Sequence, residues 1–311
     1  MLIRLGYDLS YRQTQFTPVI LMLEVHPSRA GDLHYLDVPQ TEPFVRLDRY
    51  YDAFGNRCCR LVAPPGDIRI HSETTINDSG LPDAIAPDAF QHDVQDLPYE
   101  TVQFLQGSRY CETQLLAEEA WRLFGYTTPG WGRVQAICDF VNRHLRFNYQ
   151  LARSTRTAAE AYREGVGVCR DFAHLAITFC RCMNIPARYC TGYLGDIGVP
   201  QVPDPMDFSG WFEAYLGSRW CTFDARHNVP RIGRVPIAYG RDAADVAIST
   251  SFGSSVLLSF NVVTYELVHP AGNAAPIPRG AGQGAMPPCN RCAPSVTARR
   301  SPDRPGSGGL C

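Results

Sequence analysis

The chain has 311 residues, enough for two domains with their own cores, and 45% apolar and 19% charged residues, as in globular proteins. A formal net charge of −2 gives no basis for expecting nucleic acid or an anionic membrane as a partner. All 29 basic residues are arginine, which excludes Schiff-base and P-loop chemistry because both require lysine.

The amino terminus lacks the charged start, long apolar centre and small-residue cleavage site of a signal peptide. The apolar run at residues 19–25 is too short to span a bilayer. We therefore expect a cytoplasmic protein whose twelve cysteines are mostly reduced and pack as small hydrophobic residues.

Residues 1–100 predict a β-rich, sandwich-like module. Alternating or continuous apolar runs, separated by clusters of Gly, Pro, Asn and Asp, indicate strands at residues 2–12, 19–25, 58–64 and 68–76.

Helical patterns follow, and then strands again. Apolar spacing and capping signals predict helices over residues 112–125, 130–149 and 157–165, and a fourth that begins at Cys169 and ends before Pro186. Strands are predicted over residues 188–194, 210–216, 219–225 and 256–267. Residues 101–269 therefore indicate an α+β domain. Residues 270–311 include 15 Gly or Pro residues and are predicted to be a disordered tail.

Cys169 begins the fourth predicted helix and is in step with its apolar stripe, formed by Phe172, Ala173, Ala176, Ile177, Cys180 and Met183. A helix start stabilises a thiolate, and its free N–H groups can hold an oxyanion. Position alone favours the alternative, a core cysteine at the start of a helix.

Two polar neighbours of Cys169 do not supply a base. His174 lies about 140° around the helix from Cys169, which predicts a structural histidine that holds a loop. Asp171 lies about 200° away and is interpreted as a first-turn acid or a surface charge.

The segment from 208 to 224 predicts a β-hairpin that ends at Asp224. Ser209, Trp211 and Glu213 share one face of its first strand. Together, "GVCRDFAHLA", "NIPARY" and this hairpin resemble the transglutaminase-like superfamily of papain-type cysteine enzymes, and most closely its bacterial members classed as cysteine proteases. The resemblance covers most of residues 1–265, because a β-rich amino-terminal module is also typical of that group.

The resemblance implies a papain-like core in which Cys169 is the nucleophile and Asp224 orients a histidine, with Trp211 in the substrate cleft. The family's histidine belongs at the start of the hairpin, where this chain has Ser209. Three hypotheses follow: His227 replaces the missing base, Cys169 reacts without an imidazole, or the protein is a pseudoenzyme that binds or scaffolds.

A metal site is the other class of function considered. Cys289 and Cys292 have half of a zinc-ligand spacing, but the second half is missing from their neighbourhood. The pairs Cys180/Cys182 and Cys58/Cys59 do not have tetrahedral spacing. The sequence therefore predicts no metal and no cofactor.

The expected function is acyl transfer at an amide of a protein or peptide substrate, through a Cys169 thioester. The outcome is hydrolysis by a peptidase or amidase, or transfer to an amine. Since the chain has no lysine, an acceptor lysine amine must come from another molecule.

Overall fold

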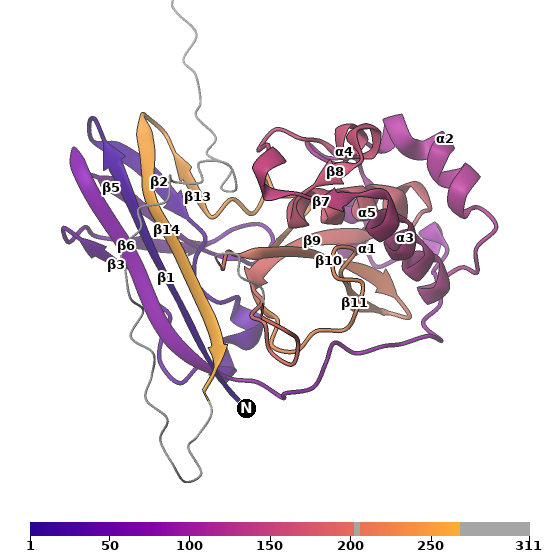
Figure 1. The fold of residues 1–311 in the computed structure, drawn as a ribbon, viewed down its shortest axis with the longest axis horizontal. Coiled ribbons are helices and arrows are strands. Elements are labelled where there is room, and N and C mark those ends of the chain that lie inside the picture. Colours follow the sequence, from indigo (N-terminus) through magenta and orange to yellow (C-terminus); the bar gives the residue numbers. More distant parts are fainter. Residues whose placement is uncertain (202–205, 268–311) are drawn as a thin grey trace, which may run out of the picture.

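The computed structural model describes residues 1–201 and 206–267 (Figure 1). Their strands are β1 (Leu2–Gln13), β2 (Thr17–Leu21), β3 (Gln40–Glu42), β4 (Asp48–Tyr51), β5 (Arg57–Ala63), β6 (Gly66–Asn77), β7 (Arg146–Phe147), β8 (Val166–Gly167), β9 (Ala187–Tyr193), β10 (Ser209–Leu216), β11 (Arg219–Phe223), β12 (Val235–Gly240), β13 (Ser249–Ser251) and β14 (Ser255–Glu266). Their α-helices are α1 (Tyr99–Val102), α2 (Thr113–Phe124), α3 (Trp131–His144), α4 (Ala158–Glu164) and α5 (Cys169–Cys182). The predicted tail at 270–311, with Cys289 and Cys292, lies outside the described residues.

Two four-stranded antiparallel sheets form the amino-terminal part, with strand orders β14-β1-β6-β3 and β13-β2-β5-β4. In β1 and β6, apolar side chains alternate with polar ones, as a sheet buried on one face requires. The domain prediction placed the strand over 256–267 in the second domain, whereas β14 pairs with β1 along nearly its whole length. Strand pairing across 250 residues leaves no local trace in the sequence.

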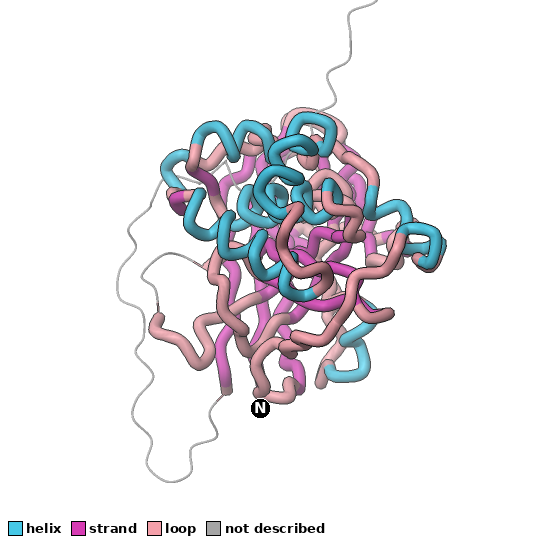
Figure 2. Tube along the Cα trace, turned by 90° about the vertical axis from the view of Figure 1, so that its right-hand side faces the viewer, coloured by secondary structure: helices cyan, strands magenta, loops and turns pink. Residues whose placement is uncertain are grey.

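A third antiparallel sheet, in the order β11-β10-β9-β12, carries helix α5 on one face. Helices α2, α3 and α4 pack around α5, and Figure 2 shows the helices together on the side of the molecule remote from the sandwich. Sheets with segregated helices confirm the predicted α+β class.

Local signals place both ends of α4 where the sequence predicts them, whereas the helix predicted over 130–149 ends at His144 and is followed by β7. Thr157 and Glu160 form a capping box at the start of α4, and Gly165 ends that helix with a left-handed φ of 63°. Helix α5 begins at Cys169 as expected, but the single apolar stripe is wrong, because Arg170 through Cys182 are all buried. The helix is covered on every side by the sheet and the other helices, and sequence periodicity does not predict that environment.

A buried carboxyl in the sandwich gives a stability prediction. Burial raises the pKa of Asp37 to about 6, although Ser72 Oγ and the Val25 N–H donate hydrogen bonds to it. The folded protein therefore binds this proton more tightly than the unfolded chain, and the stability that Asp37 provides below about pH 4 is lost as the pH rises through 6.

Replacing Asp37 with asparagine should consequently raise the free energy of unfolding by up to about 3 kcal/mol at pH 7. Near pH 4 the same substitution should change it far less. Urea unfolding of both proteins at the two pH values measures this difference. An equal effect at pH 4 and pH 7 would contradict the prediction.

Candidate active site

A cavity of about 710 Å³ lies between the sandwich and the second part of the chain. Its lining includes Cys169 at the start of α5, Ser209 at the start of β10 and His227 after β11. Thr264, Tyr265 and Glu266, at the end of β14, supply part of the wall from the amino-terminal sheets. The cavity thus brings together three of the residues that the sequence singled out, from segments that are far apart in the chain.

Cys169 is partly exposed at this cavity. Burial nevertheless raises the pKa of its thiol above the ordinary value, while the charge of Arg226 and a hydrogen bond from the Gly210 backbone N–H oppose that increase. Desolvation thus outweighs the stabilisation that the helix start can give a thiolate. Cys169 is a thiol at neutral pH, and it requires a base to become a nucleophile.

Asp224 is buried, and its carboxylate orients His227. Asp224 Oδ2 accepts hydrogen bonds from His227 Nδ1 and from Arg234 Nη2, both at 2.8 Å, while Oδ1 accepts the His227 backbone N–H at 3.0 Å. Burial alone would raise the pKa of Asp224, but Arg234 and His227 hold it well below its usual range. Asp224 therefore stays ionised and fixes both the ring and the tautomer of His227, leaving Nε2 as the free ring nitrogen.

No hydrogen bond joins the sulfur of Cys169 to His227 within residues 1–201 and 206–267. Both residues line the cavity. Catalytic hydrogen bonds often form only when substrate is bound, so the shared cavity is the relevant geometric relation.

Ser209 begins strand β10 and lines the cavity. It is 8% exposed, and its Oγ has no hydrogen-bond partner in the described part of the chain. A Cβ at the next residue, Gly210, would overlap Tyr189 Oη, so position 210 has no space for a side chain. Position 209 therefore contributes a buried hydroxyl to the cavity, and this hydroxyl has no hydrogen-bond partner in the described part of the chain.

Trp211 is not among the described residues that line the cavity. It is 2% exposed, and the Arg234 guanidinium lies 5.1 Å from the centre of its ring. Trp211 thereby supports the arginine that holds Asp224, and we assign it a structural role.

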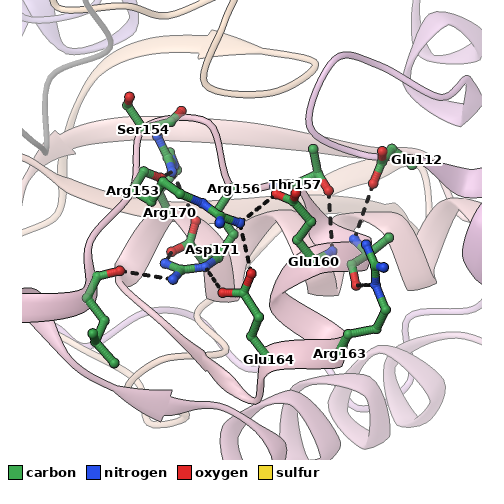
Figure 3. Close-up of polar contacts among 12 residues, drawn as sticks. Glu112, Arg153, Ser154, Arg156, Thr157, Glu160, Arg163, Glu164, Arg170 and Asp171 are labelled. Atoms are coloured by element: carbon green, nitrogen blue, oxygen red, sulfur yellow. Dashed lines mark hydrogen bonds and ion pairs between the residues drawn. The ribbon is translucent and has the colours of Figure 1, made fainter.

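An ion network holds the chain on which Cys169 sits, as Figure 3 shows. Asp171 accepts hydrogen bonds from Arg156 at 3.1 Å, from Arg170 at 3.1 Å and from the Val168 N–H at 3.0 Å. Asp171 is 1% exposed, so it is a first-turn acid, and the surface-charge alternative is wrong. A Cβ at Gly167 would lie 2.6 Å from Asp171 Cβ, which explains a glycine two residues before Cys169.

His174 also has the structural role that its position predicts. Its Nε2 accepts the backbone N–H of Ala243 at 3.0 Å and so holds the loop after β12. Burial lowers its pKa well below the ordinary value and keeps it neutral. His174 does not line the cavity of Cys169.

Two charged residues of the cavity were missed by sequence reasoning. Burial raises the pKa of Asp207 to about 6, and its Oδ1 accepts the Phe208 N–H. The Arg226 guanidinium lies 3.8 Å from the centre of the Phe147 ring. Arg226 adjoins His227 in the sequence, so the turn that brings one residue into the cavity also brings the other.

Metal-binding clusters and membrane-spanning helices are absent from residues 1–201 and 206–267. No group of three or more His, Cys, Asp or Glu side chains suited to a metal ion occurs there. None of the helices in these ranges has the length and apolar character needed to cross a bilayer.

Comparison with known proteins identifies the family. The model of the transglutaminase-like superfamily matches residues 122–225. A crystal structure described as "a Putative Cysteine Protease from Cytophaga hutchinsonii" is 30% identical with a TM-score of 0.74, and the match covers 88% of this chain and 92% of that one. "Uncharacterized protein ML0607" of Mycobacterium leprae (strain TN) is 25% identical over 223 residues, which are 67% of this chain and 76% of the relative. The chain belongs to the transglutaminase-like superfamily.

Proposed function

We propose that this protein is a cysteine enzyme that transfers an acyl group from an amide, with Cys169 as nucleophile and His227 as acid and base. The observation that carries the proposal is that Cys169 and an imidazole oriented by Asp224 line one cavity. The family and the cysteine-protease description of the Cytophaga relative support the same class of chemistry. Peptidase, amidase and amine-transfer outcomes share the first half of this reaction.

The reaction proceeds in two acyl-transfer steps. The Cys169 sulfur attacks the amide carbon while its proton passes to Nε2 of His227, and the free N–H groups of the first turn of α5 receive the oxyanion. The C–N bond then breaks, the amine leaves with the proton from His227, and a thioester remains. Water or a second amine attacks the thioester, gives a proton to His227, and the proton returns to the sulfur.

A base is necessary because desolvation favours the protonated thiol of Cys169. His227 is suited to this role since Asp224 holds its Nδ1–H and stabilises the imidazolium that forms. Ser209 has no group that titrates in the working range and cannot take the proton.

Trapping the thioester tests this proposal. The protein is mixed with p-nitrophenyl acetate, an activated acyl donor, quenched in acid and mapped by peptide mass spectrometry. We expect the acetyl group on Cys169, with acetylation slowed in His227→Ala. A protein that folds normally and carries no acetyl group on Cys169 would instead be the pseudoenzyme, the alternative favoured by serine at position 209.

Substituting histidine for Ser209 should raise amide turnover by about tenfold or more, because it returns an imidazole to the family's position beside the nucleophile. Turnover is measured as release of p-nitroaniline from an acyl p-nitroanilide. In the double variant Ser209→His, His227→Ala, activity should persist, since the base no longer comes from position 227. If Ser209→His leaves the rate unchanged, position 209 does not face the reacting atoms.

A further inference from the structure

The cavity beside Cys169 contains hydrogen-bond donors that the protein itself leaves without acceptors. The side chain of Arg226 has no hydrogen bond or ion pair within the described residues, and its guanidinium lies over the ring of Phe147. Ser209 Oγ is buried and has no hydrogen-bond partner among residues 1–201 and 206–267. A guanidinium and a hydroxyl that both lack acceptors in one cavity indicate that an acceptor arrives from outside.

Both donors lie close to the nucleophile. The charge of Arg226 acts on the Cys169 thiol, and Ser209 directly precedes Gly210, whose N–H reaches the sulfur. The other cavity arginine, Arg231, is already engaged, with hydrogen bonds to the Gly195 carbonyl at 2.9 Å and to Asp196 at 3.4 Å. Of the two arginines that line the cavity in the described part of the chain, Arg226 is therefore the one available to a ligand.

Acidic residues in the cavity do not neutralise Arg226 directly. Asp207 is near enough for Arg226 to lower its pKa, but its Oδ1 accepts the Phe208 N–H at 2.6 Å, and no ion pair joins it to Arg226 in the described ranges. Glu266 reaches the cavity from β14. Neither Asp207 nor Glu266 accepts a hydrogen bond from the Arg226 guanidinium in the described residues. A guanidinium can donate two parallel hydrogen bonds to the two oxygens of one carboxylate.

We propose that the cavity is a carboxylate subsite, in which Arg226, assisted by Ser209, binds an acidic group of the acyl donor next to Cys169. The inference rests on the proposed function, because it takes Cys169 as the nucleophile. The substrate class is then an acyl compound or peptide with a carboxylate close to the amide that is attacked. Serine at the family's histidine position gains a role in this arrangement, as a donor to the substrate.

Two alkylating agents of matched shape test the subsite. Iodoacetate and iodoacetamide react with a thiol by the same displacement of iodide, and they differ only in carrying a carboxylate or a carboxamide. The rate constant for iodoacetate is divided by that for iodoacetamide at Cys169, so the ionisation of the thiol cancels. This ratio is then divided by the same ratio for glutathione, which corrects for the different intrinsic reactivities of the two reagents. We expect a normalised ratio of about ten or more, since a charge-assisted contact is among the stronger hydrogen bonds.

Variants assign the effect to its residues. Arg226→Met, which keeps an apolar contact with Phe147, should bring the normalised ratio to about one, and Ser209→Ala should lower it by a smaller factor. Arg219→Met removes an exposed arginine of β11 outside the cavity and should leave the ratio unchanged. Circular dichroism verifies that each variant is folded, and Arg226→Lys should retain an intermediate ratio.

The outcomes separate this inference from the proposed function. Rapid alkylation of Cys169 with a wild-type ratio near one, or a high ratio that survives Arg226→Met, would overturn the carboxylate subsite alone. Failure of both reagents to alkylate Cys169 in the folded protein would overturn the subsite together with the nucleophile.

Discussion

Replacing Cys169 with alanine should abolish acyl transfer, with a loss of about 1,000-fold or more in the rate of p-nitrophenyl acetate hydrolysis. The reason is that the thioester cannot form without the sulfur, and the remaining groups of the cavity offer only binding and proton transfer. The expected loss is larger than that for His227→Ala, because a thiol retains some reactivity without its base. Steady-state kinetics with purified protein measures both values.

The matched control is Cys221→Ala. Cys221 is also buried near the hairpin, but it lies on β11 and does not line the cavity. This variant should keep nearly the full rate of p-nitrophenyl acetate hydrolysis. A comparable loss in Cys221→Ala would indicate that removing any buried cysteine lowers the rate. Hydrolysis that persists in Cys169→Ala at the wild-type rate would mean that another group carries the acyl chemistry.

Replacing Asp171 with alanine should lower the free energy of unfolding more than any other substitution proposed for this protein. The side chains of Arg156 and Arg170 are 4% and 8% exposed, so Asp171→Ala leaves two nearly buried cations without their shared anion. Breaking such a buried pair costs about 3–5 kcal/mol in the free energy of unfolding. The start of α5 also loses the hydrogen bond to the Val168 N–H, so Cys169 should lose reactivity as well.

Arg153→Ala is the control for the same network. Arg153 pairs with Glu160 and Glu164, but its side chain is 44% exposed, so its loss should cost about 1 kcal/mol or less. Urea unfolding followed by circular dichroism gives the free energies for both variants. If Asp171→Ala and Arg153→Ala lower the free energy of unfolding equally, burial of the ion network does not strengthen its contribution to stability.

The sequence predicted those parts of the fold that depend on local signals. The capping box of Thr157 and Glu160, the start of α5 at Cys169 and the hairpin from β10 to β11 are specified by neighbouring residues. The partners of β13 and β14 were not predicted, because pairing with β2 and β1 depends on contacts between distant parts of the chain. The all-round burial of α5 has the same cause.

The site was predicted in its residue types but not in its electrostatics. Cys169, Ser209 and His227 do line one cavity, and Asp224 does orient His227. The direction of the shift in the Cys169 pKa was left open by the sequence, because the packing of α5 produces a desolvation that the position of Cys169 in the chain does not reveal. Arg226 was overlooked because an arginine beside a histidine after a strand is, by pattern, a surface residue.

If His227 activates Cys169, the dependence of the Cys169 alkylation rate on pH should change when the imidazole is removed. Iodoacetamide, which is neutral, is applied to the wild type and to His227→Ala, with the modified cysteine identified by peptide mapping. We expect Cys169 to be alkylated about tenfold faster in the wild type than in His227→Ala at neutral pH. The two alkylation rates should become equal at alkaline pH, where the thiol ionises without a base. Superimposable pH profiles would contradict it, and would leave Cys169 without a base in a fold that has kept the position of its nucleophile.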